Sequence, residues 1–135
     1  MTVADQMTPG PVVVAPTTGL LDIRALFRHH RFRHVPVEDG GRLVGVVSDR
    51  DVLAAVSPFL DTPAETRRDV ATLATTARDL MTPDPQTVDA GAPLAEAARR
   101  MVEGDVSSLL VVEGGALVGI LTARDVLRAS AWLAT

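Results

Sequence analysis

Apolar residues recur at helical spacing in two stretches of the chain. Positions three, four or seven apart carry Leu20, Ile23 and Phe27 in the first stretch, and Leu94, Ala97, Ala98 and Met101 in the second. This period places the apolar side chains on one face of a helix. Pro93 precedes the second stretch, and proline favours the first position of a helix. We therefore expect a helix from about residue 20 and another that begins at Pro93.

Short aliphatic runs predict strands around these helices. They come in pairs: Val35–Val37 with Leu43–Val47, and Leu109–Val112 with Leu117–Leu121. Gly40-Gly41 and Gly114-Gly115 join the pairs and supply the positive φ angles that a hairpin turn needs. A short first strand is expected at Val12–Val14 and at Gln86–Val88, and a closing helix near Ser48 and near Thr122. Each half therefore reads β-α-β-β-α.

The two halves repeat one another at a constant offset. The matching blocks are Met7-Thr8-Pro9 with Met81-Thr82-Pro83 (81 − 7 = 74), Gly40-Gly41 with Gly114-Gly115, Leu43–Gly45 with Leu117–Gly119, and Arg50–Leu53 with Arg124–Leu127. One copy is too small to bury its apolar face alone, so the copies are expected to pack together. We divide the chain into a first repeat at residues 1–56, a linker at 57–74 and a second repeat at 75–135. A capping-box pattern at Thr62–Glu65 predicts a linker helix from about Pro63 to Thr75.

Composition narrows the classes of function. The chain has 135 residues, of which 47% are apolar and 3% aromatic, so it predicts a globular module with an aliphatic core. A net charge of -4 argues against a nucleic-acid binder, because phosphate contacts need a basic surface. The lack of cysteine excludes disulfides, thiolate chemistry and cysteine zinc sites, and fits a reducing compartment. No apolar run could span a bilayer and no signal peptide is visible, so we expect a cytoplasmic protein without membrane contact.

The duplicated unit, opened by Met-Thr-Pro and closed by Gly-apolar-apolar-Ser/Thr-x-x-Asp, resembles a tandem cystathionine-β-synthase (CBS) domain pair over nearly the whole chain. This resemblance implies an α/β (α+β) fold in which two β-α-β-β-α CBS units pack about a pseudo-twofold axis. It also implies clefts between the units that bind AMP, ADP, ATP, S-adenosylmethionine or related ligands. The family resemblance further implies a homodimer and the regulation of another protein, whose identity the sequence does not give.

Candidate binding chemistry lies where the last strand of each repeat meets a helix. Free backbone N–H groups at a helix start attract anions, and the hydroxyl of Ser48 or Thr122 can add a hydrogen bond to a phosphate. One turn later the carboxylate of Asp51 or Asp125 can accept both hydroxyls of a ribose. The same Ser/Thr-x-x-Asp spacing is also a helix capping box, which requires no ligand. The family resemblance favours the ligand role, and the two roles are compatible.

The family resemblance also places an adenine against the central strand of each repeat, where plain core packing is the alternative. The expected ligand-binding residues are Val14, Val35, Pro36, Val37, Gly45, Ser48, Arg50 and Asp51 in the first repeat, and Thr87, Leu109, Leu110, Val111, Gly119, Thr122, Arg124 and Asp125 in the second. The two glycines in this set lack a Cβ, which lets a ligand or a neighbouring chain approach closely. Leu110 departs from the family's apolar-proline pattern, so the second cleft is expected to differ in shape.

One basic segment, His29–His34, has an acidic and polar counterpart at Glu103–Ser108, so we expect the two clefts to be inequivalent. Arg31, Arg33 and His34 are candidate contacts for a di- or triphosphate. The alternative is a solvated helix end, where cations favour the helix dipole. Adjacent histidines point apart on a helix and no cysteine or acidic ligand is near in sequence, so no metal site is expected.

Three classes of function follow. The first is a non-catalytic sensor whose regulatory ligand is an adenosine nucleotide or another adenosyl compound, with no further cofactor. The second is a ligand-free interaction module that dimerises through helix faces, to which Trp132 and Leu133 could contribute. The third is an enzyme, which we do not expect because no cysteine nucleophile, compelling Ser-His-Asp order or metal constellation is present.

Overall fold

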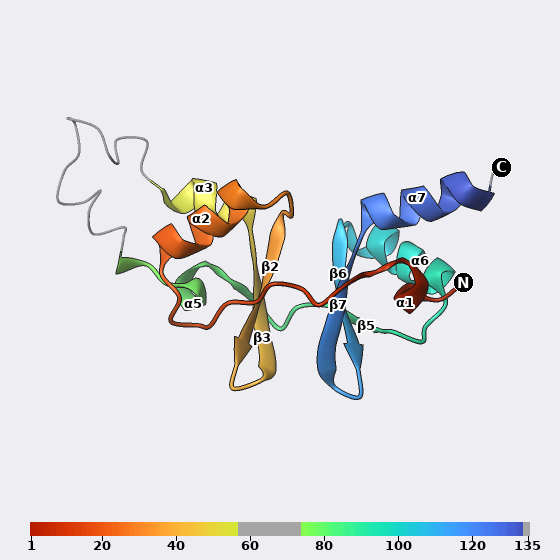
Figure 1. The fold of residues 1–135 in the computed structure, drawn as a ribbon, viewed down its shortest axis with the longest axis horizontal. Helices are drawn as coiled ribbons and strands as arrows, with labels where there is room; N and C mark the ends of the chain where they lie inside the picture. The colour runs from red at the N-terminus through yellow and green to blue at the C-terminus, as the bar shows by residue number, and fades with distance from the viewer. Residues whose placement is uncertain (57–73, 134–135) are drawn as a thin grey trace. The chain divides into compact units, whose positions relative to one another are not determined.

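The computed structural model describes residues 1–56 and 74–133, with side chains as far as residue 131. The chain divides into two compact units: unit 1 consists of Met1–Pro11 and Pro85–Thr135, and unit 2 of Val12–Asp84. In each unit the helices lie on one side of a small sheet (Figure 1). The structure thus confirms a mixed α+β fold built from two similar units. The packing of the units about a pseudo-twofold axis stays a prediction.

Unit 2 contains a three-stranded antiparallel sheet with the strand order β2-β3-β4. Its described elements are α2 (Leu20–His29), β2 (His34–Asp39), β3 (Arg42–Ser48), α3 (Asp49–Ala55), α5 (Ala77–Leu80) and β4 (Thr82–Pro83). Helix α3 packs against α2, α5 and β3. The predicted linker helix from Pro63 to Thr75 lies almost wholly outside the described residues.

Unit 1 contains a four-stranded sheet with the order β1-β7-β6-β5, in which only β5 and β6 are parallel. Its elements are α1 (Val3–Gln6), β1 (Thr8–Pro9), β5 (Thr87–Asp89), α6 (Leu94–Gly104), β6 (Ser108–Glu113), β7 (Ala116–Thr122) and α7 (Ala123–Leu133). Helix α6 begins one residue later than expected, because Pro93 has ψ near 139° and serves as the N-cap residue. Trp132 and Leu133 do belong to α7, but their side chains lie outside the described part.

The two hairpins share one register. In β2–β3 the residue pairs include Val35 with Val47 and Val37 with Gly45, and a bulge follows Val37. The β6–β7 hairpin repeats this pattern 74 positions later, with its bulge after Val111. Both turns are glycine pairs with φ near 58° and 83°, which residues with a Cβ rarely adopt. The predicted hairpins are confirmed.

The first strand differs between the repeats, and Pro36 supplies the reason. In unit 1 the amide of Leu110 donates to the carbonyl oxygen of Gln86 at 3.3 Å, which extends the parallel β5–β6 ladder. In unit 2 the equivalent donor is missing because proline has no N–H. The strand predicted at Val12–Val14 is therefore wrong in extent: it shrinks to a single parallel bridge between Val14 and Val37.

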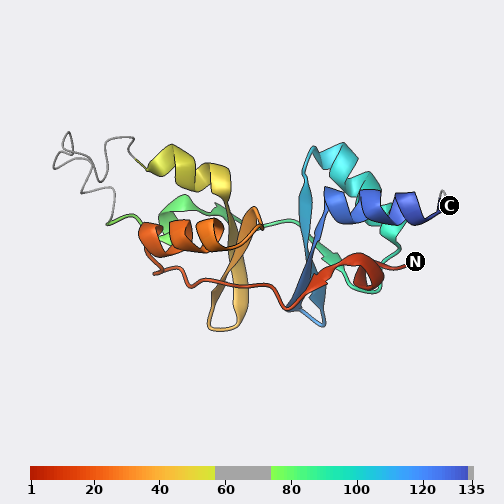
Figure 2. The same ribbon diagram turned by 45° about the horizontal axis from the view of Figure 1, so that its top comes forward.

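Each unit takes its Met-Thr-Pro segment from the other sequence repeat. Strand β1, from the first repeat, pairs with β7, and β4, from the second repeat, pairs with β3. Figure 2 shows the red N-terminal segment among the blue and cyan elements of unit 1. The repeats 1–56 and 75–135 are therefore units of sequence, whereas the compact units in space exchange their opening segments.

Alternation along the strands separates two faces of each sheet. Toward the helices, Val35, Val37 and Val47 join the core of unit 2, and Leu109, Val111 and Leu121 join that of unit 1. The opposite side, here called the far face, carries Pro36 with Val46 in unit 2 and Leu110 with Ile120 in unit 1, which form cross-strand pairs and belong to neither core cluster. Pro36 and Leu110 are nevertheless buried, whereas Val46 and Ile120 are half-buried.

Candidate functional site

The start of helix α3 is held by a complete capping box. The Ser48 Oγ accepts a hydrogen bond from the Asp51 amide at 3.1 Å, and the Asp51 Oδ2 accepts one from the Ser48 amide at 2.8 Å. Ser48 is the last residue of β3, so its extended backbone passes directly into the helix. The structure therefore shows the capping interpretation of Ser-x-x-Asp at this helix.

Helix α7 begins in the same way. The Thr122 amide donates to the Asp125 Oδ2 at 2.8 Å, and the Asp125 amide donates to the Thr122 Oγ1 at 3.2 Å. Asp125 is almost fully buried, with 5% of its surface exposed. Its second oxygen, Oδ1, lies 3.5 Å from the Arg128 Nη1.

Equivalent capping boxes also start the short helices α1 and α5. The Asp5 Oδ2 accepts from the Thr2 amide at 2.8 Å, and the Asp79 Oδ2 accepts from the Thr76 amide at 2.9 Å. Four Ser/Thr-x-x-Asp sequences of the described chain thus serve as caps, two of them outside the predicted site. Capping alone therefore does not mark a ligand site, and the distinction must come from the surface that each helix start faces.

The loop before each hairpin is hydrogen-bonded to the first residue of the helix that follows that hairpin. The Asp49 amide donates to the Arg33 carbonyl oxygen at 3.0 Å, and the Ala123 amide donates to the Ser107 carbonyl oxygen at 2.8 Å. Together with the capping boxes, these bonds satisfy three of the four amide groups that an α-helix leaves unpaired at its N-terminus. A phosphate at this place would compete with the internal hydrogen bonds of the ligand-free chain.

Strand pairing places the helix starts at the edge of the far face. In unit 2, His34 pairs with Ser48, two residues along from the pair of Pro36 with Val46. In unit 1, Ser108 pairs with Thr122, next to the pair of Leu110 with Ile120. Thr87 pairs with Leu110 and Thr82 with Val46, so these threonines lie on the same face. Each far face has an apolar middle with hydroxyl groups toward the helix start.

Ten of the predicted ligand-binding residues fall into two groups. Those whose side chains lie in a core are Val14, Val35, Val37, Leu109 and Val111, and they can offer a ligand only backbone groups. Those on the far face are Pro36, Ser48, Thr87, Leu110 and Thr122. Sequence reasoning omitted Val46 and Ile120 from the site. The alternation of side chains between the two faces of β3 and β7 is the sequence signal that could have identified these residues.

The glycines Gly45 and Gly119 make room for a neighbouring chain segment. A Cβ at Gly45 would lie 2.5 Å from the Met81 Sδ and 3.0 Å from the Thr82 carbonyl oxygen. A Cβ at Gly119 would meet the Met7 sulfur and would lie 2.9 Å from the Thr8 carbonyl oxygen. Of the two expectations for these glycines, close approach of a chain is the one that the structure shows.

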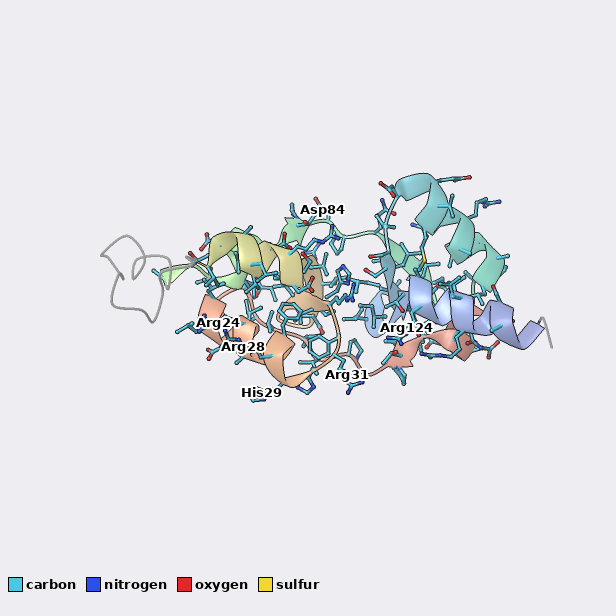
Figure 3. The ribbon with its side chains drawn as sticks, turned by 90° about the horizontal axis from the view of Figure 1, so that it is seen from above. Arg24, Arg28, His29, Arg31, Asp84 and Arg124 are labelled. Atoms are coloured by element: carbon cyan, nitrogen blue, oxygen red, sulfur yellow. The ribbon has the colours of Figure 1, made fainter. Side chains whose placement is uncertain are left out.

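The basic segment leaves two arginines in solvent. Arg31 and Arg33 are exposed, and Figure 3 shows Arg31 on the loop that follows α2. Phe32 anchors this loop: its ring stacks on His30 with centroids 4.9 Å apart and meets Phe27 edge-on at 5.8 Å. Arg50 and Arg124, in the first turns of α3 and α7, are also exposed.

His34, at the end of the basic segment, is the first residue of β2 and is half-buried. Burial lowers the pKa of His34 below its ordinary value, and the nearby Arg33 acts in the same direction, while the carboxylates of Asp49 and Asp51 oppose them. The neutral ring is therefore favoured in the ligand-free unit. A bound phosphate would add a negative charge and would raise the pKa of His34 again.

Among residues 1–56 and 74–133, no group of three or more His, Asp or Glu side chains is arranged to hold a metal ion. Within the same residues, no helix has both the length and the apolar character for crossing a bilayer.

Comparison with known proteins identifies the repeat. The sequence model of the CBS domain matches residues 3–58 and 77–131. The chain is 36% identical over 150 residues to the "CBS domain-containing protein CBSX2, chloroplastic" of Arabidopsis thaliana, in a match that covers 96% of this chain and 63% of that protein. The chain therefore spans less than two thirds of the length of this relative.

Two solved structures are also similar. The crystal structure of CBSX2 in complex with AMP has a TM-score of 0.81 and 37% identity, and the match covers 99% of this chain and 98% of that one. The CBS domain of the bacterial CNNM/CorC family Mg2+ transporter in complex with ATP has a TM-score of 0.76 and 26% identity, with 95% of this chain and 85% of that one covered.

Proposed function

Because this chain belongs to the CBS domain family, whose sequence model matches both repeats, we propose that it is a non-catalytic regulatory module that binds an adenosine-containing ligand. The ligand class is AMP, ADP, ATP or S-adenosylmethionine. One observation carries the proposal: in both units a hydroxyl, a carboxylate and backbone amides meet at the hydroxyl-bearing end of an apolar sheet face. Similar structures that contain AMP and ATP support this ligand class.

Each chemical part of a nucleotide has a partner in this arrangement. The half-buried Val46 or Ile120 of the far face, beside the buried Pro36 or Leu110, suits the flat adenine. The carboxylates of Asp51 and Asp125 accept the ribose hydroxyls. Ser48 and Thr122 donate to phosphate, with amides of the same helix start beside them.

The capping boxes explain how such a site remains stable when it is empty. Without ligand, the Asp51 Oδ2 and the Ser48 Oγ satisfy each other's backbone amides. When a nucleotide binds, its oxygens replace part of this network, so the backbone does not have to refold. Any regulatory effect equals the difference in ligand affinity between the conformations of the module.

In unit 2, the Arg31, Arg33 and His34 side chains extend the phosphate-binding surface. These residues lie on the loop and strand that lead to Ser48, and the Arg33 carbonyl oxygen bonds directly to the α3 start. A chain of two or three phosphates would meet positive charge there.

We further propose that the module forms a homodimer and regulates another protein. Leu53 on α3 and Leu127 on α7 occupy equivalent positions in the two repeats, and their side chains are 75% and 68% exposed. Exposed leucines repeated on two helices supply apolar area for an interface.

Thermal-shift measurements with AMP, ADP, ATP and S-adenosylmethionine test the proposal. At about 100 times its Kd, a ligand stabilises the folded chain by about 2.7 kcal/mol, which raises Tm by several degrees. Asp51→Ala and Asp125→Ala should each reduce the shift. The matched controls are Asp79→Ala and Asp5→Ala, which remove the same capping carboxylate elsewhere in each unit and should retain it.

The alternative is a ligand-free interaction module. It predicts that none of these compounds changes Tm, while dimerisation persists. The control variants could also lose the ligand-induced rise in Tm as fully as Asp51→Ala and Asp125→Ala do. That result would show that the loss comes from removing a helix cap and not a ligand contact.

A further inference from the structure

The two candidate sites differ in the helix residue three positions after the proposed ribose-binding aspartate. In unit 1 the Arg128 Nη1 lies 3.5 Å from the Asp125 Oδ1, one turn along α7. The same position in α3 is Ala54, which cannot form an ion pair with Asp51. Both carboxylates are otherwise held alike, since each accepts its N-cap amide through Oδ2 at 2.8 Å.

We propose that Arg128 is an affinity-determining residue that competes with the ribose hydroxyls for Asp125, so that the Asp51 site fills first. This inference rests on the proposed function. A ribose diol donates two hydrogen bonds and needs a carboxylate oxygen that is not already engaged. At Asp125 the ligand must displace the guanidinium group from Oδ1, whereas at Asp51 no arginine occupies the corresponding position.

The burial of the Asp125 carboxylate makes this competition effective. The Asp125 side chain is only 7% exposed, so little water can replace the arginine as its partner, while Arg128 is 60% exposed and can swing into solvent. The carboxylate therefore loses a charged partner when the ribose arrives. The affinity of the Asp125 site for the ribose is lower as a result.

The loop charges act in the same direction for a phosphorylated ligand. Unit 2 carries Arg31 and Arg33 ahead of its hairpin, and at the equivalent positions unit 1 carries Asp105 and Ser107. A nucleotide phosphate thus meets positive charge near Ser48 and negative charge near Thr122. We expect AMP to fill the Asp51 site at a concentration that leaves the Asp125 site largely empty.

Calorimetric titration with AMP in single-site variants isolates each site. Asp125→Ala retains only the Asp51 site, and Asp51→Ala retains only the Asp125 site; Asp51→Asn and Asp125→Asn repeat the comparison with side chains that can still cap. Arg128→Ala is then added to the Asp51→Ala chain, and Ala54→Arg to the Asp125→Ala chain. Ala54 and Arg128 both lie on exposed parts of their helices, so these additions should not prevent folding.

The expected results are opposite for the two additions. Arg128→Ala should tighten AMP binding at the Asp125 site about three- to tenfold, and Ala54→Arg should weaken binding at the Asp51 site by a similar factor. Two results overturn the inference while the proposed function stands. The first is that Arg128→Ala leaves AMP binding unchanged or weakens it. The second is that the Asp125 site binds AMP more tightly than the Asp51 site. A wild-type chain that binds none of AMP, ADP, ATP and S-adenosylmethionine overturns both.

Discussion

Met7 lies against Gly119, so that the opening segment of the first repeat packs on the last strand of the second. The relation is reciprocal, because Met81 lies against Gly45. Each Met-Thr-Pro segment and each hairpin glycine therefore form one structural contact, although they are far apart in the chain.

Removal of residues 1–11 should destabilise the unit that contains the C-terminal repeat. These residues supply strand β1 to β7 and the fully buried Val3 to the core of unit 1. Loss of Val3 and of the strand should cost about 2–4 kcal/mol. Hydrogen exchange should show faster exchange in β6 and β7 with little change in β2 and β3. Faster hydrogen exchange in β2 and β3 with little change in β6 and β7 would contradict the pairing of β1 with β7.

Gly119→Ala and Gly45→Ala should each destabilise the chain by about 1–3 kcal/mol, because a new Cβ overlaps the methionine side chain and the adjoining backbone. Urea denaturation measures this loss. Gly19→Ala is the control, since a Cβ there meets no atom within 4 Å. An equal loss in the control would show that general glycine effects, not close packing, dominate.

His34 should make the chain less stable in mild acid. Burial lowers the pKa of His34 in the folded chain, whereas the unfolded chain keeps the ordinary value of about 6.5. The unfolded state then binds more protons, so stability falls as the pH drops from about 6.5 toward the folded pKa. Urea denaturation at pH 7.5 and 5.5 should show this loss, and His34→Gln should reduce it.

His29→Gln provides the matched control for this pH effect, because His29 lies exposed at the end of α2 (Figure 3). It should keep the wild-type pH dependence. If His29→Gln removes the loss of stability in acid and His34→Gln leaves it intact, His34 is not the group that causes it.

Leu53→Glu and Leu127→Glu should shift the proposed homodimer toward monomer, because each places a charge in an apolar interface. Sedimentation at several protein concentrations measures the change. Val102→Glu is the control: this α6 residue is 81% exposed and lies outside the two leucine-bearing helices. Dissociation by Val102→Glu alone would move the interface to α6.

The sequence predicted most of the local structure, because its signals act over a few residues. The glycine pairs specified the turns, and Ser48 and Thr122 marked the helix starts. The exchange of Met7 and Met81 between repeats could not be predicted in this way, since a constant offset is equally compatible with either pairing of two identical segments. Only the packing against Gly45 and Gly119 distinguishes them.

At the candidate site, Asp51 and Asp125 were expected to combine a capping role with a ligand-binding role. The structure shows the capping role, and the ligand-binding role stays a prediction. Val14 was selected although its side chain lies in the core, because one bridge to Val37 fixes its direction and no local pattern reveals that bridge. The ion pair of Arg128 with Asp125 depends on burial that composition does not show.

Val3 is synthesised long before Ala90 and Ala92, yet its amide donates to the Ala92 carbonyl oxygen and the Ala4 amide donates to that of Ala90. Residues 1–11 can therefore join unit 1 only after much of the second repeat has been translated. Unit 2, which closes within Val12–Asp84, can be completed before that point. The order of synthesis thus favours the completion of unit 2 before that of unit 1.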